Sequence, residues 1–309
     1  MNKNQVQNTQ NKILQVFSEN QTQALLEKSR KLIKQYQELP SPNIEYLVCI
    51  TPRSGSSWLT EMLSKTKILG NPEEWFNPGN LPGIIKNSYP CLDPIEYFDC
   101  IKKTQCTNNK VFGMELSFFQ YRIVKMALDL VEKEASLRLL NLKNIKTIYL
   151  YRLDLVAQAV SLYRAVETGM FHSVQQNASE KGAINFDYLE EKIWNWLIHI
   201  LQQEFGWQQN FQKQGVSPLW LTYEEMWSNP NLTKLRIINY ILGNQNEINN
   251  QIIDMQYNHT KIANSQSNEM VINFYKNNAD KIDFCLKNRG KIGNNQIIKS
   301  LEISKKYST

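Results

Sequence analysis

The sequence predicts an α/β protein with one main domain, in which a mostly parallel central sheet is flanked by helices. Short apolar runs typical of buried strands alternate along the 309-residue chain with longer segments whose apolar residues recur at helical spacing. Strands that alternate with helices in this way form a parallel sheet. We therefore expect an N-terminal helical extension at 1–42, a single domain at 43–280 and a polar C-terminal tail at 281–309.

Four apolar runs are predicted as the strands, and most of the segments between them as helices. The strands are expected at 46–50, 110–116, 145–151 and 218–222. Helices are expected in the region 58–69 and at 117–134, 155–168, 186–214 and 232–242. Gly70 is the expected C-terminal cap of the first helix, and Asp154 the N-cap of the third. Residues 71–109 are expected to form loops and short helices around a site, and no element is predicted beyond Gly243.

Composition narrows the classes of function. The net charge of +6 comes from 35 basic and 29 acidic side chains spread along the chain. Without a basic block interleaved with aromatic residues, this charge indicates a solvated surface with an anion site, not nucleic-acid binding. No apolar run approaches the roughly 18 residues of a membrane helix, and the N-terminal sequence lacks the apolar core of a signal peptide. The five scattered cysteines and three histidines favour a cytoplasmic protein without a metal site.

The sequence TPRSGSSWL at 51–59 joins the first strand to the first helix. A buried strand, a loop of small residues and an amphipathic helix together present backbone N–H groups to an anion. The loop lacks the Lys that precedes Ser or Thr in a Walker A loop. It offers an arginine, hydroxyl groups and the N–H groups at a helix start. The residues that we expect to contact the anion are Arg53, Ser54, Gly55, Ser56, Ser57 and Trp58.

A second pair of candidate anion ligands follows the third predicted strand. Arg152 stands at the end of this strand, and Ser161 lies nine residues later in the next helix. Ligands bind at the carboxyl ends of strands in sheets of this kind, and arginine can hold a phosphate by two parallel hydrogen bonds. An ion pair between Arg152 and Asp154 is the structural alternative. Two separate anion ligand sets indicate a nucleotide that carries two phosphorylated positions.

These motifs together resemble the PAPS-dependent sulfotransferases, and within them the branch typified by the bacterial trehalose 2-sulfotransferase (the Stf family). TPRSGSSWL is similar to the 5′-phosphosulfate loop of the family, with Arg53 where cytosolic sulfotransferases usually carry lysine. YRLDLVAQAVSLYRAVETGMFH, from 151, is similar to the 3′-phosphate segment of the branch, and GNPEEWF, from 70, resembles its Gly-x-Pro-x-Glu-aromatic-Phe motif. TYEEMWSNP and KIANSQSNEM fall where the branch has related segments. The resemblance runs from about 46 to 278 and implies a P-loop-like sulfotransferase fold.

The resemblance also implies a mechanism and a set of residues. PAPS would donate a sulfuryl group to a hydroxyl or amine, without a metal, and Arg53 would neutralise the charge on the leaving phosphate. Glu74 matches the proposed base of the branch, and the variable Glu73 beside it is expected to be solvated. Lys261 joins the donor-binding residues. Candidate acceptor-binding residues are Trp75, Phe76, Glu115 and His172, of which His172 is also the next base to test after Glu74.

Glu115 departs from the pattern of the branch, which has lysine in the corresponding segment. The carboxylate is either one half of an ion pair or part of the acceptor site. In the second case the acceptor is cationic, because a carboxylate binds a guanidinium group by paired hydrogen bonds. A natural product of secondary metabolism, such as a saxitoxin-type alkaloid, would then suit the site better than a neutral disaccharide. Sulfation could occur on oxygen or on nitrogen.

Two other readings of the sequence compete with a small-molecule sulfotransferase. A P-loop kinase that acts on a small metabolite would need ATP and magnesium, and the missing Walker lysine speaks against it. A non-catalytic nucleotide-binding relative would use the extension at 1–42 for partners, but it would not need Arg53, Arg152, Ser161 and Glu74 together. No nucleic-acid or membrane partner is expected, and association into a homodimer stays open.

Overall fold

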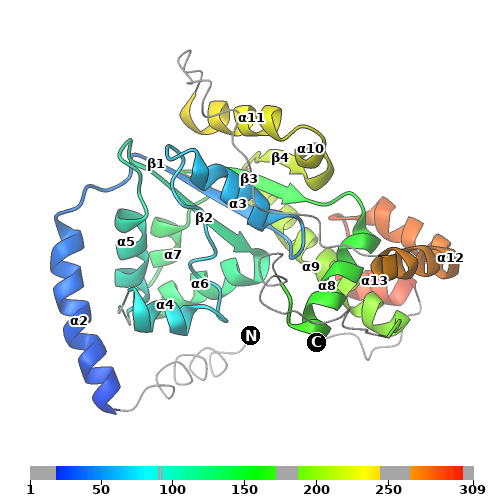
Figure 1. Cartoon of the computed structure of the whole chain (residues 1–309), viewed down its shortest axis with the longest axis horizontal. Coiled ribbons are helices and arrows are strands. Elements are labelled where there is room, and N and C mark those ends of the chain that lie inside the picture. The colour runs from blue at the N-terminus through cyan, green and yellow to red at the C-terminus, as the bar shows by residue number, and fades with distance from the viewer. Residues whose placement is uncertain (1–18, 90, 92, 172–186, 244–264, 302–309) are drawn as a thin grey trace. The chain divides into compact units, whose positions relative to one another are not determined.

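The computed structural model of the chain describes residues 19–89, 91, 93–171, 187–243 and 265–301 (Figure 1). Its central element is a four-stranded parallel sheet in the order β2-β1-β3-β4, flanked by helices. The strands are β1 (Ile44–Ile50), β2 (Val111–Ser117), β3 (Lys146–Tyr151) and β4 (Leu219–Thr222). The predicted α/β class is therefore confirmed, and each predicted strand begins within two residues of its observed start.

The strands are apolar because the sheet is covered on both faces. The last five residues of β1, all seven of β2 and four consecutive residues of β3 are buried. Strands in a parallel sheet that lies between helices have no solvent-facing side, so they carry continuous apolar runs and do not alternate with polar residues. This is why the runs were recognisable in the sequence.

The described chain divides into two compact units, and each is treated separately below. The first unit contains residues 19–48, 63–148 and 238–243. The second contains 49–62, 149–171, 187–237 and 265–301. The chain crosses between the two units within β1, β3, α3 (Ser56–Lys65) and α11 (Pro230–Leu242).

The first unit carries five further helices. They are α2 (Glu19–Gln37), α4 (Leu81–Asn87), α5 (Pro94–Thr104), α6 (Phe118–Val131) and α7 (Ala135–Leu139). Helix α2, which lies in the expected N-terminal extension, packs against α5 (Figure 1). At this contact the buried Tyr36 donates a hydrogen bond of 3.3 Å to the carbonyl oxygen of Glu96. Helix α5 is capped by Asp93, whose carboxylate accepts from the backbone N–H groups of Ile95 and Glu96.

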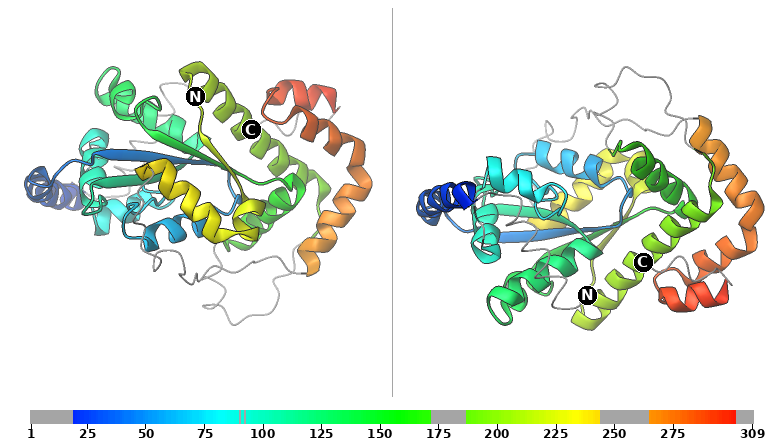
Figure 2. Two further views of the ribbon diagram at one scale, coloured as in Figure 1. Left: turned by 90° about the horizontal axis from the view of Figure 1, so that it is seen from above. Right: turned by 90° about the horizontal axis from the view of Figure 1, so that it is seen from below.

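The second unit is built around α8. Its helices besides α3 and α11 are α8 (Leu155–Thr168), α9 (Glu190–Gln214), α10 (Tyr223–Ser228), α12 (Ser265–Asn288) and α13 (Asn294–Ser300). Helix α8 packs against the long α9 and α12, and α13 packs against α9 (Figure 2). The segment expected to be a polar tail contributes to this core, because Ile297 and Leu301 are buried in it. None of the helices in the described ranges is both long enough and apolar enough to cross a membrane.

Two predicted caps have different outcomes. Asp154 caps α8 as expected, since its side chain accepts from the backbone N–H of Ala157. The expectation that Gly70 caps a helix reaching residue 69 was wrong, because α3 ends at Lys65. The Thr66 hydroxyl donates to the carbonyl of Leu63 at 2.6 Å, and the next residue has a positive φ, which ends the helix. Gly70 has another role: with φ +79° it passes so near β2 that a Cβ would lie 2.9 Å from the nitrogen of Gly113.

Candidate anion-binding site and a carboxylate site

The loop between β1 and α3 is tightly turned and tightly packed. Arg53 (φ 66°) and Gly55 (φ 89°) both have left-handed backbones. A Cβ on Gly55 would lie 2.5 Å from a ring carbon of Tyr223, so no larger residue fits against α10. Ser54 is fully buried, and α3 begins at Ser56, directly after the turn. The loop therefore presents the N–H groups of a helix start at a position that its packing determines.

Arg53 is connected to the second predicted anion segment. Its Nε donates to the Ser161 hydroxyl at 3.1 Å, and its Nη1 donates to the carbonyl of Phe171. The pKa of Arg53 is lowered to about 10. Burial of the guanidinium group is the largest cause, and the positive charges of Arg152 and Arg164 are smaller causes in the same direction. Arg152 and Arg164 therefore both lie close enough to Arg53 in the second unit to repel its positive charge. An anion placed among them would remove this repulsion.

Arg152 follows the end of β3 and is only partly neutralised. Its guanidinium carbon lies 4.8 Å above the ring of Tyr223, and its Nε is 3.9 Å from a carboxylate oxygen of Glu224. That distance is too long for a hydrogen bond. The ion pair considered between Arg152 and Asp154 is not formed, because Asp154 caps α8 and Arg152 faces Glu224.

In this region the Ser54 hydroxyl and the Nε of Arg152 are buried donors that have no hydrogen-bond partner among the described residues. Buried polar groups are almost always hydrogen-bonded, so unsatisfied donors beside positive charge fit a phosphate or sulfate oxygen.

Gln158, from α8, joins the loop to this helix: its amide donates at 2.8 Å to the Thr51 hydroxyl and at 2.8 Å to the Pro52 carbonyl.

An aromatic cluster adjoins the loop. Trp58 and Trp227 meet edge to face with ring centroids 5.5 Å apart, and Trp227 lies nearly parallel to Tyr223 at 6.4 Å. Trp227 is 51% exposed, so an aromatic surface is open to a planar ligand. Sequence reasoning marked the segment TYEEMWSNP but did not select its two aromatic residues. Gln158 and Arg164 were also named only as parts of a motif.

The carboxylate candidate lies in the first unit. Glu74 is half-buried and its neighbour Glu73 is exposed, as expected for the latter. The Oε2 of Glu74 accepts a hydrogen bond of 2.8 Å from the side-chain amide of Gln120, and a second bond from Asn77. Neither amide was selected from the sequence, although Gln120 stands in a Ser-x-x-Gln capping pattern at the start of α6.

The aromatic pair after Glu74 anchors this segment to α5. Phe76 is buried, with its ring 5.5 Å from that of Tyr97 and 5.3 Å from that of Phe98. Trp75 donates from its indole to the carbonyl of Asn71 at 2.9 Å, and its own carbonyl accepts from the Tyr97 hydroxyl at 2.7 Å. These contacts hold the backbone on both sides of Glu74.

Glu115 lies on β2 and is only 2% exposed. Its backbone N–H donates to the carbonyl of Glu73 at 3.2 Å, so it is adjacent to the segment that carries Glu74. The remaining two predicted residues, His172 and Lys261, lie outside the described residues.

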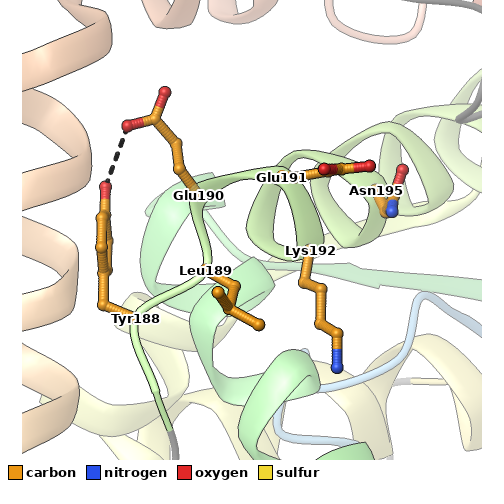
Figure 3. Close-up of a pocket in the computed structure, with 6 residues that line it drawn as sticks. All are labelled: Tyr188, Leu189, Glu190, Glu191, Lys192 and Asn195. Carbon is orange, nitrogen blue, oxygen red and sulfur yellow. Dashed lines mark hydrogen bonds between the residues drawn. The ribbon is translucent and has the colours of Figure 1, made fainter.

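A separate pocket of about 470 Å³ lies in the second unit at the start of α9 (Figure 3). It is lined by Tyr188, Leu189, Glu190, Glu191, Lys192 and Asn195. Glu190 accepts a hydrogen bond of 3.2 Å from the Tyr188 hydroxyl, and Lys192 is paired with Glu167 at 2.8 Å. With two carboxylates and its lysine paired, this pocket does not suit an anion. None of the predicted site residues that the structure describes lines it.

Comparison with known proteins establishes the class of this protein. Residues 45–278 match the model of the Stf0 sulphotransferase family, and the chain belongs to that family. It is a sulfotransferase.

Two curated relatives are similar over much of their length. The trehalose 2-sulfotransferase of Mycolicibacterium smegmatis is 28% identical over 215 residues, covering 60% of this chain and 79% of the relative. The trehalose 2-sulfotransferase of Mycobacterium tuberculosis is 26% identical over 213 residues, with the same coverage of both chains. The predicted family is thereby confirmed.

Proposed function

We propose that this sulfotransferase uses PAPS as its donor and transfers the sulfuryl group to a hydroxyl or amine of a small-molecule acceptor, leaving PAP. One observation carries the choice of donor. Arg152 and Arg164 place positive charge beside Arg53 of the loop, and within the described residues the buried Ser54 hydroxyl of the loop and the Nε of Arg152 have no hydrogen-bond partner. A nucleotide with phosphate groups at two positions supplies oxygens for both donors. The exposed face of Trp227, beside Trp58, suits its adenine base.

Different residues of the chain have different roles in the proposed reaction. PAPS supplies the sulfuryl group and a phosphate leaving group. Arg53, with the N–H groups at the start of α3, neutralises the charge that grows on the phosphate oxygen as its bond to sulfur breaks. Arg152 and Ser161 bind the second phosphate position. Glu74 accepts the proton that the acceptor loses as the new bond to sulfur forms.

For the acceptor, we propose a molecule that carries a guanidinium or amine group, for which a saxitoxin-type alkaloid is one example. Support comes from Glu115, whose carboxylate lies on β2 next to the segment of Glu74. Because Glu115 is 2% exposed, solvent screens its charge little, and a nearby cation would feel it strongly. Trehalose, named for the two relatives, is the second candidate acceptor.

We further propose that the protein works in the cytoplasm. All five cysteines are free thiols, and four of them are buried. This pattern suits a reducing compartment, where thiols stay unpaired.

Calorimetry with PAP, and separately with ATP and magnesium, tests the choice of donor. We expect PAP to bind without a metal and ATP to bind much more weakly. Magnesium-dependent ATP binding, with no binding of PAP, would instead support a kinase.

A second experiment addresses the acceptor: trehalose and a guanidinium compound compete for sulfation by the parent enzyme and by Glu115→Gln. Efficient sulfation of trehalose with the cation ignored would contradict a cationic acceptor.

A further inference from the structure

Arg289 is a largely buried arginine that the proposed chemistry does not use. It directly follows α12 and lies beyond residues 45–278, which match the family model. Its side chain is 14% exposed and is paired with Glu204 of α9, which is itself 2% exposed. Both contacts of the pair are short: Nε to Oε2 and Nη2 to Oε1 each measure 2.6 Å. A bidentate pair of this kind holds the guanidinium plane in one orientation.

The same guanidinium holds the turn that carries Arg152. Its Nη2 donates to the carbonyl oxygen of Arg152 at 2.5 Å, and its Nη1 donates to the carbonyl oxygen of Leu153 at 3.1 Å. Its central carbon also lies 5.5 Å from the ring of Tyr151, the last residue of β3. Arg289 therefore contacts three consecutive residues at the end of this strand.

Glu224 holds the same turn through its N–H groups. The Oε2 of Glu224 accepts from the N–H of Leu153 at 2.9 Å, and its Oε1 accepts from the N–H of Asp154 at 3.3 Å. The carbonyl groups of the turn thus accept from the largely buried guanidinium group of Arg289, and its N–H groups donate to the carboxylate of Glu224. The backbone that carries the Arg152 side chain is therefore held by the positive charge of Arg289 and by the negative charge of Glu224.

Arg289 is not itself available to bind an anion. Four of its five N–H groups are used, two on Glu204 and two on the turn. A lysine could not replace it, because one ammonium group cannot reach both carboxylate oxygens and both carbonyls in this planar arrangement. The arrangement therefore requires a guanidinium group and leaves it no free edge for a ligand.

We propose that Arg289, oriented by Glu204, is a positioning residue for donor binding. It holds the carbonyls of Arg152 and Leu153 so that the Arg152 side chain is already in place before the nucleotide arrives. Ordering a flexible arginine at the moment of binding costs affinity, and a turn that is fixed beforehand avoids much of that cost. This inference rests on the proposed role of Arg152 in holding a phosphate of the donor.

The test measures PAP affinity by calorimetry in the full chain for the parent, Arg289→Lys and Glu204→Gln. We expect each variant to bind PAP about tenfold more weakly than the parent. The KM for the acceptor should stay unchanged while the KM for the donor rises. Ile282→Ala is the matched control, because Ile282 is buried in the core within α12, the helix that Arg289 directly follows, and its aliphatic side chain cannot hydrogen-bond to the turn. Its melting temperature should fall without loss of PAP affinity.

A double-mutant cycle separates positioning from a general loss of structure. In an Arg152→Ala background, Arg289→Lys should change PAP affinity less than about twofold, because the side chain that it positions is gone. An equal loss in both backgrounds, or an equal loss in Ile282→Ala, would overturn the inference. So would parent-like affinity in Arg289→Lys. Failure of the parent to bind PAP would instead overturn the proposed donor, and the inference would fall with it.

Discussion

The side-chain amide of Gln120 donates a hydrogen bond of 2.8 Å to the Oε2 of Glu74. Gln120 is itself held in place, because its Oε1 accepts from the backbone N–H of Ser117 at 2.7 Å in the capping box of α6. Asn77 donates to the same oxygen of Glu74. Within the described residues the other carboxylate oxygen, Oε1, receives no hydrogen bond. One oxygen therefore orients the carboxylate, and the other has no hydrogen bond within the described residues that would oppose the proposed role of Glu74 as a base.

Replacing Glu74 with glutamine should remove the proposed base and keep the fold. We expect the rate of sulfuryl transfer to fall about 10²–10⁴-fold, the usual contribution of a general base, while PAP affinity stays unchanged. The exposed Glu73→Gln is the control and should behave like the parent. A rate for Glu74→Gln within a factor of three of the parent would remove Glu74 from the mechanism.

Gln120→Glu should shift the pH dependence of the reaction. The new carboxylate would lie within hydrogen-bonding distance of Glu74, and two carboxylates that share a site cannot easily both be ionised. The apparent pKa of the pair rises, so the acidic limb of kcat/KM should move to higher pH. A pH profile measured at saturating donor checks this shift. The exposed Arg122→Gln, also on α6, should leave the profile unmoved, and an unmoved profile in Gln120→Glu would contradict the assignment.

Arg152 and Arg53 should respond differently to replacement by alanine. Arg152→Ala should weaken PAP binding by roughly 2–4 kcal/mol, because it removes a charge-assisted contact to a partly buried phosphate. Arg53→Ala should depress turnover more than PAP affinity, since the charge that we propose it neutralises grows in the transition state. Calorimetry and steady-state kinetics on both variants measure the difference. Equal effects on binding and turnover in both would count against this division.

Gly55→Ala should damage the anion loop. The methyl group would lie 2.5 Å from the Tyr223 ring, at a residue whose φ is already +89°. The loop must then move, and a displacement of about 1 Å at a catalytic group can lower turnover roughly 10²-fold. Gly215→Ala is a matched control, because Gly215 also has a positive φ (+64°) but open space around its Cβ position. It should cost stability alone, which thermal unfolding alongside the turnover assay would show.

His199 should make stability depend on pH. Burial lowers the pKa of this imidazole, on α9, from 6.5 to about 4. Below pH 6.5 the unfolded chain binds a proton that the folded chain does not, so the free energy of unfolding falls as the pH drops toward 4. The loss attributable to His199 is roughly 3 kcal/mol across that interval. Denaturant titrations at pH 7 and pH 4.5 should show a smaller difference in His199→Gln than in the parent. An identical difference in both would show that His199 does not contribute.

Local patterns carried much of the fold. The strands could be predicted because both faces of a parallel sheet are buried, so that consecutive residues of a strand such as β1 are apolar. The Asp154 cap was equally visible, since a cap and its N–H partner lie three residues apart. The end of α3 could not be predicted in this way. The hydrogen bond from Thr66 to Leu63 that ends the helix has no clear sequence signal, and Gly70 offered an equally plausible end.

The sequence by itself determined the family, and it located the candidate anion loop and the candidate base Glu74, since each is a short motif whose residues lie close together along the chain. Only the tertiary structure decided what surrounds them. Gln120 hydrogen-bonds to Glu74, which lies 46 positions away in the sequence, and Arg289 hydrogen-bonds to Arg152, which lies 137 positions away. Tyr223, at the start of α10, packs against Gly55. Such partners are chosen by packing between elements, and a single side chain that meets another at long range leaves no periodicity or spacing in the sequence.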